Sequence, residues 1–193
     1  MNTPAHLIFG VTAFGARDAH RITIAAALGA FIPDASLYLL AGWELFVVGT
    51  NPQVVFDQMY FSESWQRIFR VDNSFVLWGL TLVLAIMTGS KVAIALTGAA
   101  LLHLALDFPL HNDDARAHFW PLTNWKFISP VSYWDRDHFG HIVGPLEALA
   151  VLACCAVLWR RYAGVVVMQC VIAGFAILQI APVFIWVFIF DGG

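Results

Sequence analysis

The stretch from Leu101 to Pro121 begins as an apolar segment, runs into a polar one, and contains three of the chain's seven histidines. Within it, His103 and Asp107 are four residues apart, so on a helix they lie on one face, one turn from each other. A histidine and a carboxylate placed in this way can ligate one divalent cation, or one can orient the other. The alternative is a buried His–Asp hydrogen bond that only ties two helices together.

The composition indicates the class of protein that must position these groups. The 193 residues are 60% hydrophobic and 12% charged, with a mean hydropathy of +0.75. A soluble domain carries roughly 25% charged residues and about 45–50% apolar ones. So few charges cannot cover a globule in water, and the sequence therefore predicts an integral membrane protein. The net charge of −3 argues against a nucleic-acid partner, which would favour a basic face.

The apolar runs predict an all-α, polytopic membrane bundle of about five to six membrane helices, beginning with a short helical hairpin. Thr3 is expected as the N-cap of the first helix, with Pro4 at its first helical position. This helix spans only roughly 17 Å, which is too short to cross a bilayer core of about 30 Å. The expected apolar segments are residues 3–14, 22–32, 35–48, 74–88, 92–108, 142–159 and 165–190.

The segment 35–48 follows Pro33 and either continues the second helix past a proline kink or forms a separate helix. Residues 50–73 are expected to form an interfacial loop with room for an amphipathic helix. No linker divides the chain, so residues 1–193 are expected to form a single domain. The polar loop 110–140 is expected to carry part of its site.

The expected turns and loops fall on two opposite faces of the bundle. Short turns at 15–21, 89–91 and 160–163 lie on one face, and the loops 50–73 and 110–140 lie on the other. Six of the seven histidines map to the loop face or to the helix ends that meet it. The dense positive charge of the short turns predicts that the turn face is cytoplasmic.

Ionisable residues from several segments are expected to meet near the loop face. At helical rise, His103 lies about 18 Å from the turn face, and His6 and Asp34 reach similar heights. Such groups are costly inside a membrane unless they pair or bind something. We expect a divalent metal, zinc or a similar ion, with the ligands His6, Asp34, His103, Asp107 and His141. The alternative is a structural polar network between helices.

The loop 110–140 supplies candidates for catalysis and for substrate binding. We expect Asp114, His118 or His138 to serve as a general base or acid. Arg116 and Arg136 could bind a phosphate group of a lipid headgroup through two parallel hydrogen bonds. The alternative is that these residues are solvated, as most polar residues of an exposed loop are, or that they only sit at the membrane interface.

Three short motifs resemble those of a known family. They are the T-P-A-H that ends at His6, the P-D of Pro33-Asp34, and the H-L-x-L-D-F that starts at His103 and is followed by a W-P. In this order, over roughly the first 125 residues, they resemble the YdjM-like family of inner-membrane-associated, metal-dependent hydrolases. The resemblance implies that the four residues His6, Asp34, His103 and Asp107 are metal ligands, and that the chain lies in a bacterial inner membrane.

One segment departs from the family pattern. The family carries H-R-G-x-T-H-S at the start of its next membrane helix, where this chain reads Arg70-Val-Asp-Asn-Ser74. Ser74 matches the family serine, Asn73 stands in place of a ligand histidine, and the upstream histidine has no counterpart. Asp72 or Asn73 could replace a ligand through oxygen, or Asp72 could cap the helix. The polar loop offers further candidate replacements, which are His111, Asp113, Asp114, His118, Asp135, Asp137, His138 and His141.

The expected function is metal-assisted hydrolysis of an ester or phosphoester in a lipid or other amphiphilic substrate at the membrane edge. The alternative is a non-catalytic accessory or assembly subunit of a membrane complex, in which the His/Asp layer is structural. A transporter is less well supported, because the chain shows no inverted repeat. The sequence identifies no oligomeric or complex partner.

Overall fold

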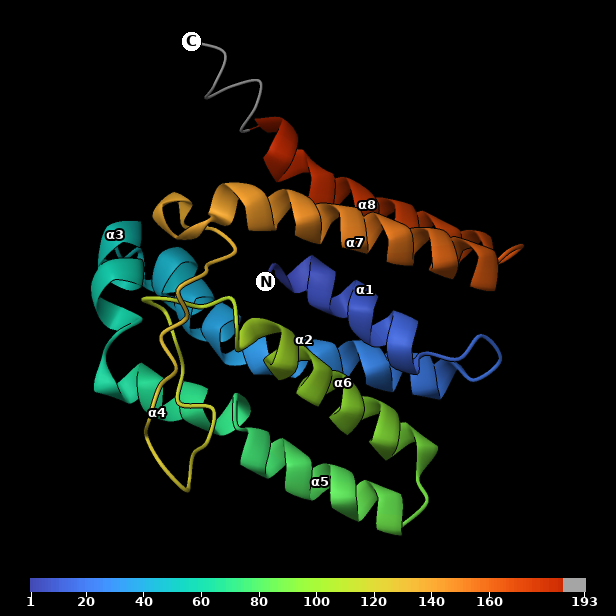
Figure 1. Cartoon of the computed structure of the whole chain (residues 1–193), viewed down its shortest axis with the longest axis horizontal. Helices are drawn as coiled ribbons and strands as arrows, with labels where there is room; N and C mark the ends of the chain where they lie inside the picture. Colours follow the sequence, from blue (N-terminus) through green and yellow to red (C-terminus); the bar gives the residue numbers. More distant parts are fainter. Residues whose placement is uncertain (186–193) are drawn as a thin grey trace.

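The computed structural model describes residues 1–185, and over this part the chain is all-helical, without strands (Figure 1). The α-helices are α1 Thr3–Phe14, α2 His20–Trp43, α3 Pro52–Val54, α4 Glu63–Asp72, α5 Phe75–Met87, α6 Lys91–Asp107, α7 Gly140–Arg161 and α8 Val166–Ile185. Two π-helical turns, η1 Glu44–Val48 and η2 Val55–Met59, and a 3₁₀ turn, η3 Arg136–His138, complete the regular structure. The expected last helix begins at Val166 rather than 165, and its residues 186–190 lie outside the described part.

The long helices run along the same direction of the molecule, with their connections at two ends (Figure 1). The tight connections between α1 and α2, α5 and α6, and α7 and α8 lie at one end. The N-terminus, α3, α4 and the long loop between α6 and α7 lie at the other. The polar loop therefore meets the N-terminus at one end of the bundle.

Three helical stretches are long and apolar enough to cross a membrane. They are His20–Val48, Glu63–Met87 and Gly140–Arg161, of 29, 25 and 22 residues. The expected all-α class is thus confirmed, together with membrane-span candidates. The helix α1 and the first part of α8, Val166–Ile180, are apolar but shorter.

The helix α2 continues through Pro33 without a break, so the first of the two expected alternatives for residues 35–48 is confirmed. A proline has no N–H, and the helix would lose hydrogen bonding at this point in a membrane. Neighbouring side chains donate to backbone carbonyls here. His103 Nδ1 lies 2.7 Å from Ala30 O, and Asn73 Nδ2 lies 3.0 Å from Pro33 O. These contacts tie α6 and the α4–α5 junction to the segment of α2 around Pro33.

Small residues allow α2 and α6 to pack with their backbones in contact. A Cβ added at Gly29 would lie 1.9 Å from the carbonyl oxygen of Leu96, and one added at Gly98 would lie 2.6 Å from the Phe14 ring. The buried residues between these helices are Ala25, Ala26, Ala30, Ala95 and Ala99. Close approach through small residues is typical of helices that pack inside membranes. It brings His103 against the backbone of α2.

Candidate metal centre

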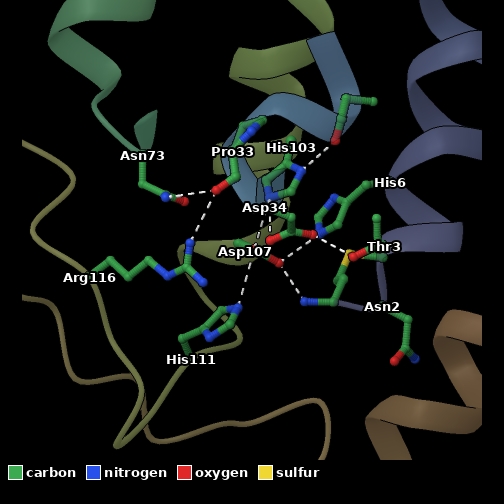
Figure 2. Close-up of polar contacts among 12 residues, drawn as sticks. Asn2, Thr3, His6, Pro33, Asp34, Asn73, His103, Asp107, His111 and Arg116 are labelled. Atoms are coloured by element: carbon green, nitrogen blue, oxygen red, sulfur yellow. Dashed lines mark hydrogen bonds and ion pairs between the residues drawn. The ribbon is translucent and has the colours of Figure 1, made fainter. Parts of the chain in front are cut away.

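Three helices bring four of the expected ligands into one buried cluster (Figure 2). His6 comes from α1, Asp34 from α2, and His103 and Asp107 from the end of α6. All four are buried, and no more than 8% of any of them is exposed. One ligand atom from each of His6, His103 and Asp107 lies within 4.8 Å of the others. This group could hold a metal ion.

The Asp107 carboxylate lies at the centre of the cluster. Its Oδ1 is 2.9 Å from His6 Nε2, and its Oδ2 is 3.2 Å from both His103 Nε2 and His111 Nε2. Asp34 Oδ1 is 3.7 Å from His103 Nε2. Atoms bound to one tetrahedral zinc at about 2.1 Å lie about 3.4 Å from each other. The separations in the cluster are therefore compatible with ligand atoms that share an ion, and the shorter ones are also compatible with direct hydrogen bonds.

The hydrogen bond of His103 fixes which of its nitrogens faces the carboxylates. Nδ1 lies 2.7 Å from Ala30 O, and a carbonyl oxygen only accepts, so Nδ1 carries the proton. If the ring is neutral, Nε2 then carries a lone pair instead of a proton. This buried atom has no hydrogen-bond partner. It faces Asp107 and Asp34, whose oxygens are acceptors as well. Only a cation or a proton makes this arrangement favourable, and histidines that bind metals are oriented in this way.

His111 repeats this pattern, although it was named only as a replacement and not among the five expected ligands. Its Nδ1 lies 2.7 Å from Asp114 Oδ2, and its Nε2 faces Asp107. Burial disfavours a charge on this ring, but the negative charge of Asp107 and the hydrogen bonds to Asp107 and Asp114 raise the pKa of His111 above its usual value. The same negative field favours any cation among these carboxylates.

The N-terminal end of α1 completes the wall of the cluster. The rings of His6 and His103 stack, with centroids 3.6 Å apart, and His6 Nδ1 is buried without a hydrogen-bond partner. The amino group of Met1 also contacts Asp107. The N-cap of α1 is Asn2 rather than the expected Thr3. Thr3 instead donates from Oγ1 to Asp34 Oδ2 over 2.6 Å, which orients this carboxylate.

A buried carboxylate in α7, Glu147, anchors α1, and its position inside an apolar helix predicts either a group that supports the site or an interhelical hydrogen-bonding group. Glu147 Oε1 accepts hydrogen bonds from Asn2 Nδ2 over 2.9 Å and from Gln179 Nε2 over 2.7 Å. This network joins α7 and α8 to the residue that precedes α1. An ionisable residue inside an apolar helix was the only sequence signal for it.

A cavity of about 380 Å³ opens beside the cluster. Its polar wall includes Asp34, Asp107, His111, Asp114 and Arg116. The cavity is also lined by Phe56, Phe61 and Trp134, aromatic side chains that are each about half exposed. The π-helical turn η2 and the polar loop supply most of this aromatic rim. The volume is within the range of small-molecule sites, about 300–1,000 Å³.

Two of the expected loop residues lie at the cavity. Asp114 Oδ1 is buried without a hydrogen-bond partner, while its Oδ2 is bound to His111. Burial opposes ionisation, but the hydrogen bond and charge of His111 lower the pKa of Asp114 below its usual value. Arg116 is also buried, and its guanidinium points toward the cluster from the side of Pro33 (Figure 2).

Four other expected residues lie outside the residues that line the cavity. His118 is buried, with Nδ1 2.9 Å from Asn73 O and its ring against Phe75 and Phe108. His138 pairs with Asp135 over 2.6 Å and is half-buried. Arg136, in η3, and His141, in the first turn of α7, are exposed. The path of the polar loop, which folds back before α7, separates these side chains from the cluster.

The segment that departs from the family pattern supports the cluster from outside. Asn73 is fully buried, and it donates to the carbonyl of Pro33, directly before Asp34. The group that could hold a metal ion, His6, His103 and Asp107, does not include Asp72. Ser74, rather than Asp72, caps α5. Asn73 therefore positions the backbone that carries a ligand.

Comparison of the chain with protein-family models, curated proteins and solved structures gave no match in any of the three. The resemblance to the YdjM-like family stays a prediction.

Proposed function

We propose that the chain is a membrane-embedded, metal-dependent hydrolase that acts on an ester or phosphoester of a lipid or other amphiphilic substrate. The observation that carries the proposal is His103 Nε2, a buried atom without a hydrogen-bond partner that faces the carboxylates of Asp107 and Asp34. In this proposal the chain is a YdjM-like protein of the bacterial inner membrane. The helices α1, α6 and α8 lie in the membrane beside the three long spans.

The donor set fits zinc or a similar ion, because neutral imidazole nitrogens and carboxylate oxygens are its usual ligands. The ligands would be His6, His103, Asp107 and His111, with Asp34 as a further oxygen. A bound divalent ion supplies a Lewis acid and lowers the pKa of a coordinated water. Ala30 O and Asp114 accept hydrogen bonds from Nδ1 of His103 and of His111, so Nε2 of both rings stays directed into the cluster.

Asp114 is the best-placed general base among the three expected candidates. Its Oδ2 orients His111, its Oδ1 has no hydrogen-bond partner, and the residue lines the cavity. The lowered pKa keeps this carboxylate ionised at neutral pH, which is the form that accepts a proton. His118 and His138 are engaged elsewhere, with Asn73 O and Asp135.

The aromatic rim supports an amphiphilic substrate. Phe56, Phe61 and Trp134 surround a polar cavity and expose about half of their surface. Aromatic side chains are favoured at the height of lipid headgroups. A ligand with its polar group at Asp107 could leave an apolar chain against this rim.

A non-catalytic accessory subunit is the second candidate, and one observation favours it. The amino group of Met1 and His6 both contact Asp107, so groups of the chain itself already satisfy part of the cluster. A structural network would hold α1 against α6 without any ion.

Metal analysis separates the two candidates. Protein purified in detergent should contain about one divalent ion per chain by plasma mass spectrometry. His103→Ala and Asp107→Asn should reduce the content to background, while His20→Ala, at an exposed position, should not change it. If the other variants fail to fold, His111→Gln is a milder change that tests the same loss of metal content. Metal-loaded protein should hydrolyse a phosphoester or ester in mixed micelles, and a chelator should stop it. If the parent protein contained only background metal, the hydrolase would be excluded and the accessory subunit would remain as the candidate function.

A further inference from the structure

Arg116 is a buried charge at the cavity that the proposed hydrolysis does not yet use. Only 5% of the residue is exposed, and its guanidinium carbon lies 5.0 Å from the centroid of the Phe69 ring. Nη1 donates to Pro33 O over 3.3 Å, while the buried Nε has no hydrogen-bond partner. Among residues 1–185 the structure gives this guanidinium no carboxylate within ion-pair distance.

A buried cation without a paired anion is costly. Asp34, Asp107, Asp72 and Asp114 act on Arg116 only through their longer-range charge, and the first two face His103. A divalent ion in the cluster would take up the negative charge of Asp34 and Asp107. The guanidinium would keep no directly paired carboxylate among the described residues, and the cavity that Arg116 lines is open to an anion.

Two tyrosines also line the cavity. The Tyr60 hydroxyl interacts with Arg116 and donates to the backbone carbonyl of Asp114 over 3.2 Å. Tyr133 also lines the cavity, with its ring 5.3 Å from that of His111. The cavity is thus lined both by Arg116 and by residues of the proposed metal centre.

We infer that Arg116 binds a phosphoryl group of the ligand, so that the site takes a phosphoester rather than a neutral carboxylic ester. A guanidinium can give two parallel hydrogen bonds to two oxygens of a phosphate, and a neutral ester offers no charge to match it. The phosphoryl group would lie between Arg116 and the Asp107 cluster (Figure 2). The hydrolysis of the phosphoester rests on the proposed function. The binding of the phosphate anion rests on Arg116 alone. The source is either a lipid headgroup or a water-soluble phosphoester.

Binding measurements on the full chain in an uncharged detergent test this inference. The probes are inorganic phosphate, glycerol 3-phosphate, dihexanoyl phosphatidic acid and the neutral dihexanoylglycerol, by titration calorimetry with and without added zinc. Arg116→Gln should weaken binding of every phosphate probe at least 10-fold, and Arg116→Lys should weaken it less. Arg67→Gln, at an exposed arginine of α4, is the matched control and should change nothing. Tighter binding of the diacyl probe than of glycerol 3-phosphate identifies a lipid source, and the reverse identifies a soluble one.

A purely structural role for Arg116 predicts a different result. Loss of the contact to Pro33 would lower the unfolding temperature but would leave the affinity of the folded protein for phosphate unchanged. Equal phosphate affinity in the parent, Arg116→Lys and Arg116→Gln would overturn the inference, as would equal binding of dihexanoylglycerol and phosphatidic acid. Metal content separates this failure from failure of the proposed function. A chain without metal whose phosphate binding still depends on Arg116 refutes only the hydrolase, and a metal-loaded chain indifferent to Arg116→Gln refutes only the phosphate site.

Discussion

Gly29→Ala should weaken both the fold and the metal centre, because Gly29 is a point of backbone contact between α2 and α6. The new methyl group would lie 1.9 Å from Leu96 O. Non-bonded carbon and oxygen atoms rarely approach closer than about 3 Å, so the helices must separate by about 1 Å. The adjacent hydrogen bond from His103 Nδ1 to Ala30 O, now 2.7 Å, would then pass out of range. Overpacking costs about 1–3 kcal/mol and a lost hydrogen bond about 1 kcal/mol, so we expect a loss of about 2–4 kcal/mol.

Thermal unfolding in detergent and metal content by mass spectrometry measure both effects. Gly42→Ala is the matched control, because Gly42 lies in the same helix and a Cβ there would meet nothing within 4 Å. We expect this control to bind metal normally and to be unchanged or more stable by up to about 1 kcal/mol. If Gly29→Ala were as stable and as metal-loaded as Gly42→Ala, the close approach of α2 and α6 would not position His103.

Three further substitutions test separate parts of the structure. Burial, the largest effect, lowers the pKa of His118 from 6.5 to about 4, so the parent should keep full stability above pH 6.5 and lose up to about 3 kcal/mol as the pH falls to 4. His118→Phe should flatten this loss in thermal unfolding scans, and an unchanged pH profile would contradict the assignment. Arg161 donates to three backbone carbonyls at the C-terminal end of α1, so Arg161→Ala should lower the free energy of unfolding by about 1–3 kcal/mol, with Arg161→Lys in between. Equal stability of these two variants would refute that role. Asp114→Asn should weaken metal binding 10–100-fold in a chelator competition, because the amide no longer orients His111 as a carboxylate does, and an unchanged affinity would place Asp114 outside the centre.

The meeting of His6, Asp34 and His103 could be predicted from the sequence because helical rise is regular. Each residue lies a countable distance from a turn, so its height in the bundle follows from its position in the chain. The continuation of α2 through Pro33 could not be decided locally. The side chains that contact the carbonyls of Ala30 and Pro33, His103 and Asn73, are distant in sequence.

The loop residues were harder to place, because an irregular segment has no fixed rise or face. His111 follows Asp107 by four residues, but Pro109 lies between them, and a helical spacing no longer applies beyond the end of α6. His118 and His141 are histidines of the same polar segment or its end, so residue type alone does not distinguish them from His111. Only the folded path of the loop turns His118 toward Asn73 and leaves His141 exposed.

X-ray absorption at the metal edge of the purified protein tests the central claim most directly. The account predicts nitrogen and oxygen ligands at about 2.0–2.2 Å, with outer-shell scattering from at least two imidazole rings. That scattering should decrease in His103→Gln and in His111→Gln, and should stay unchanged in His141→Gln. A metal without imidazole scattering, or a spectrum that neither of the first two substitutions alters, would contradict a metal centre built around Asp107.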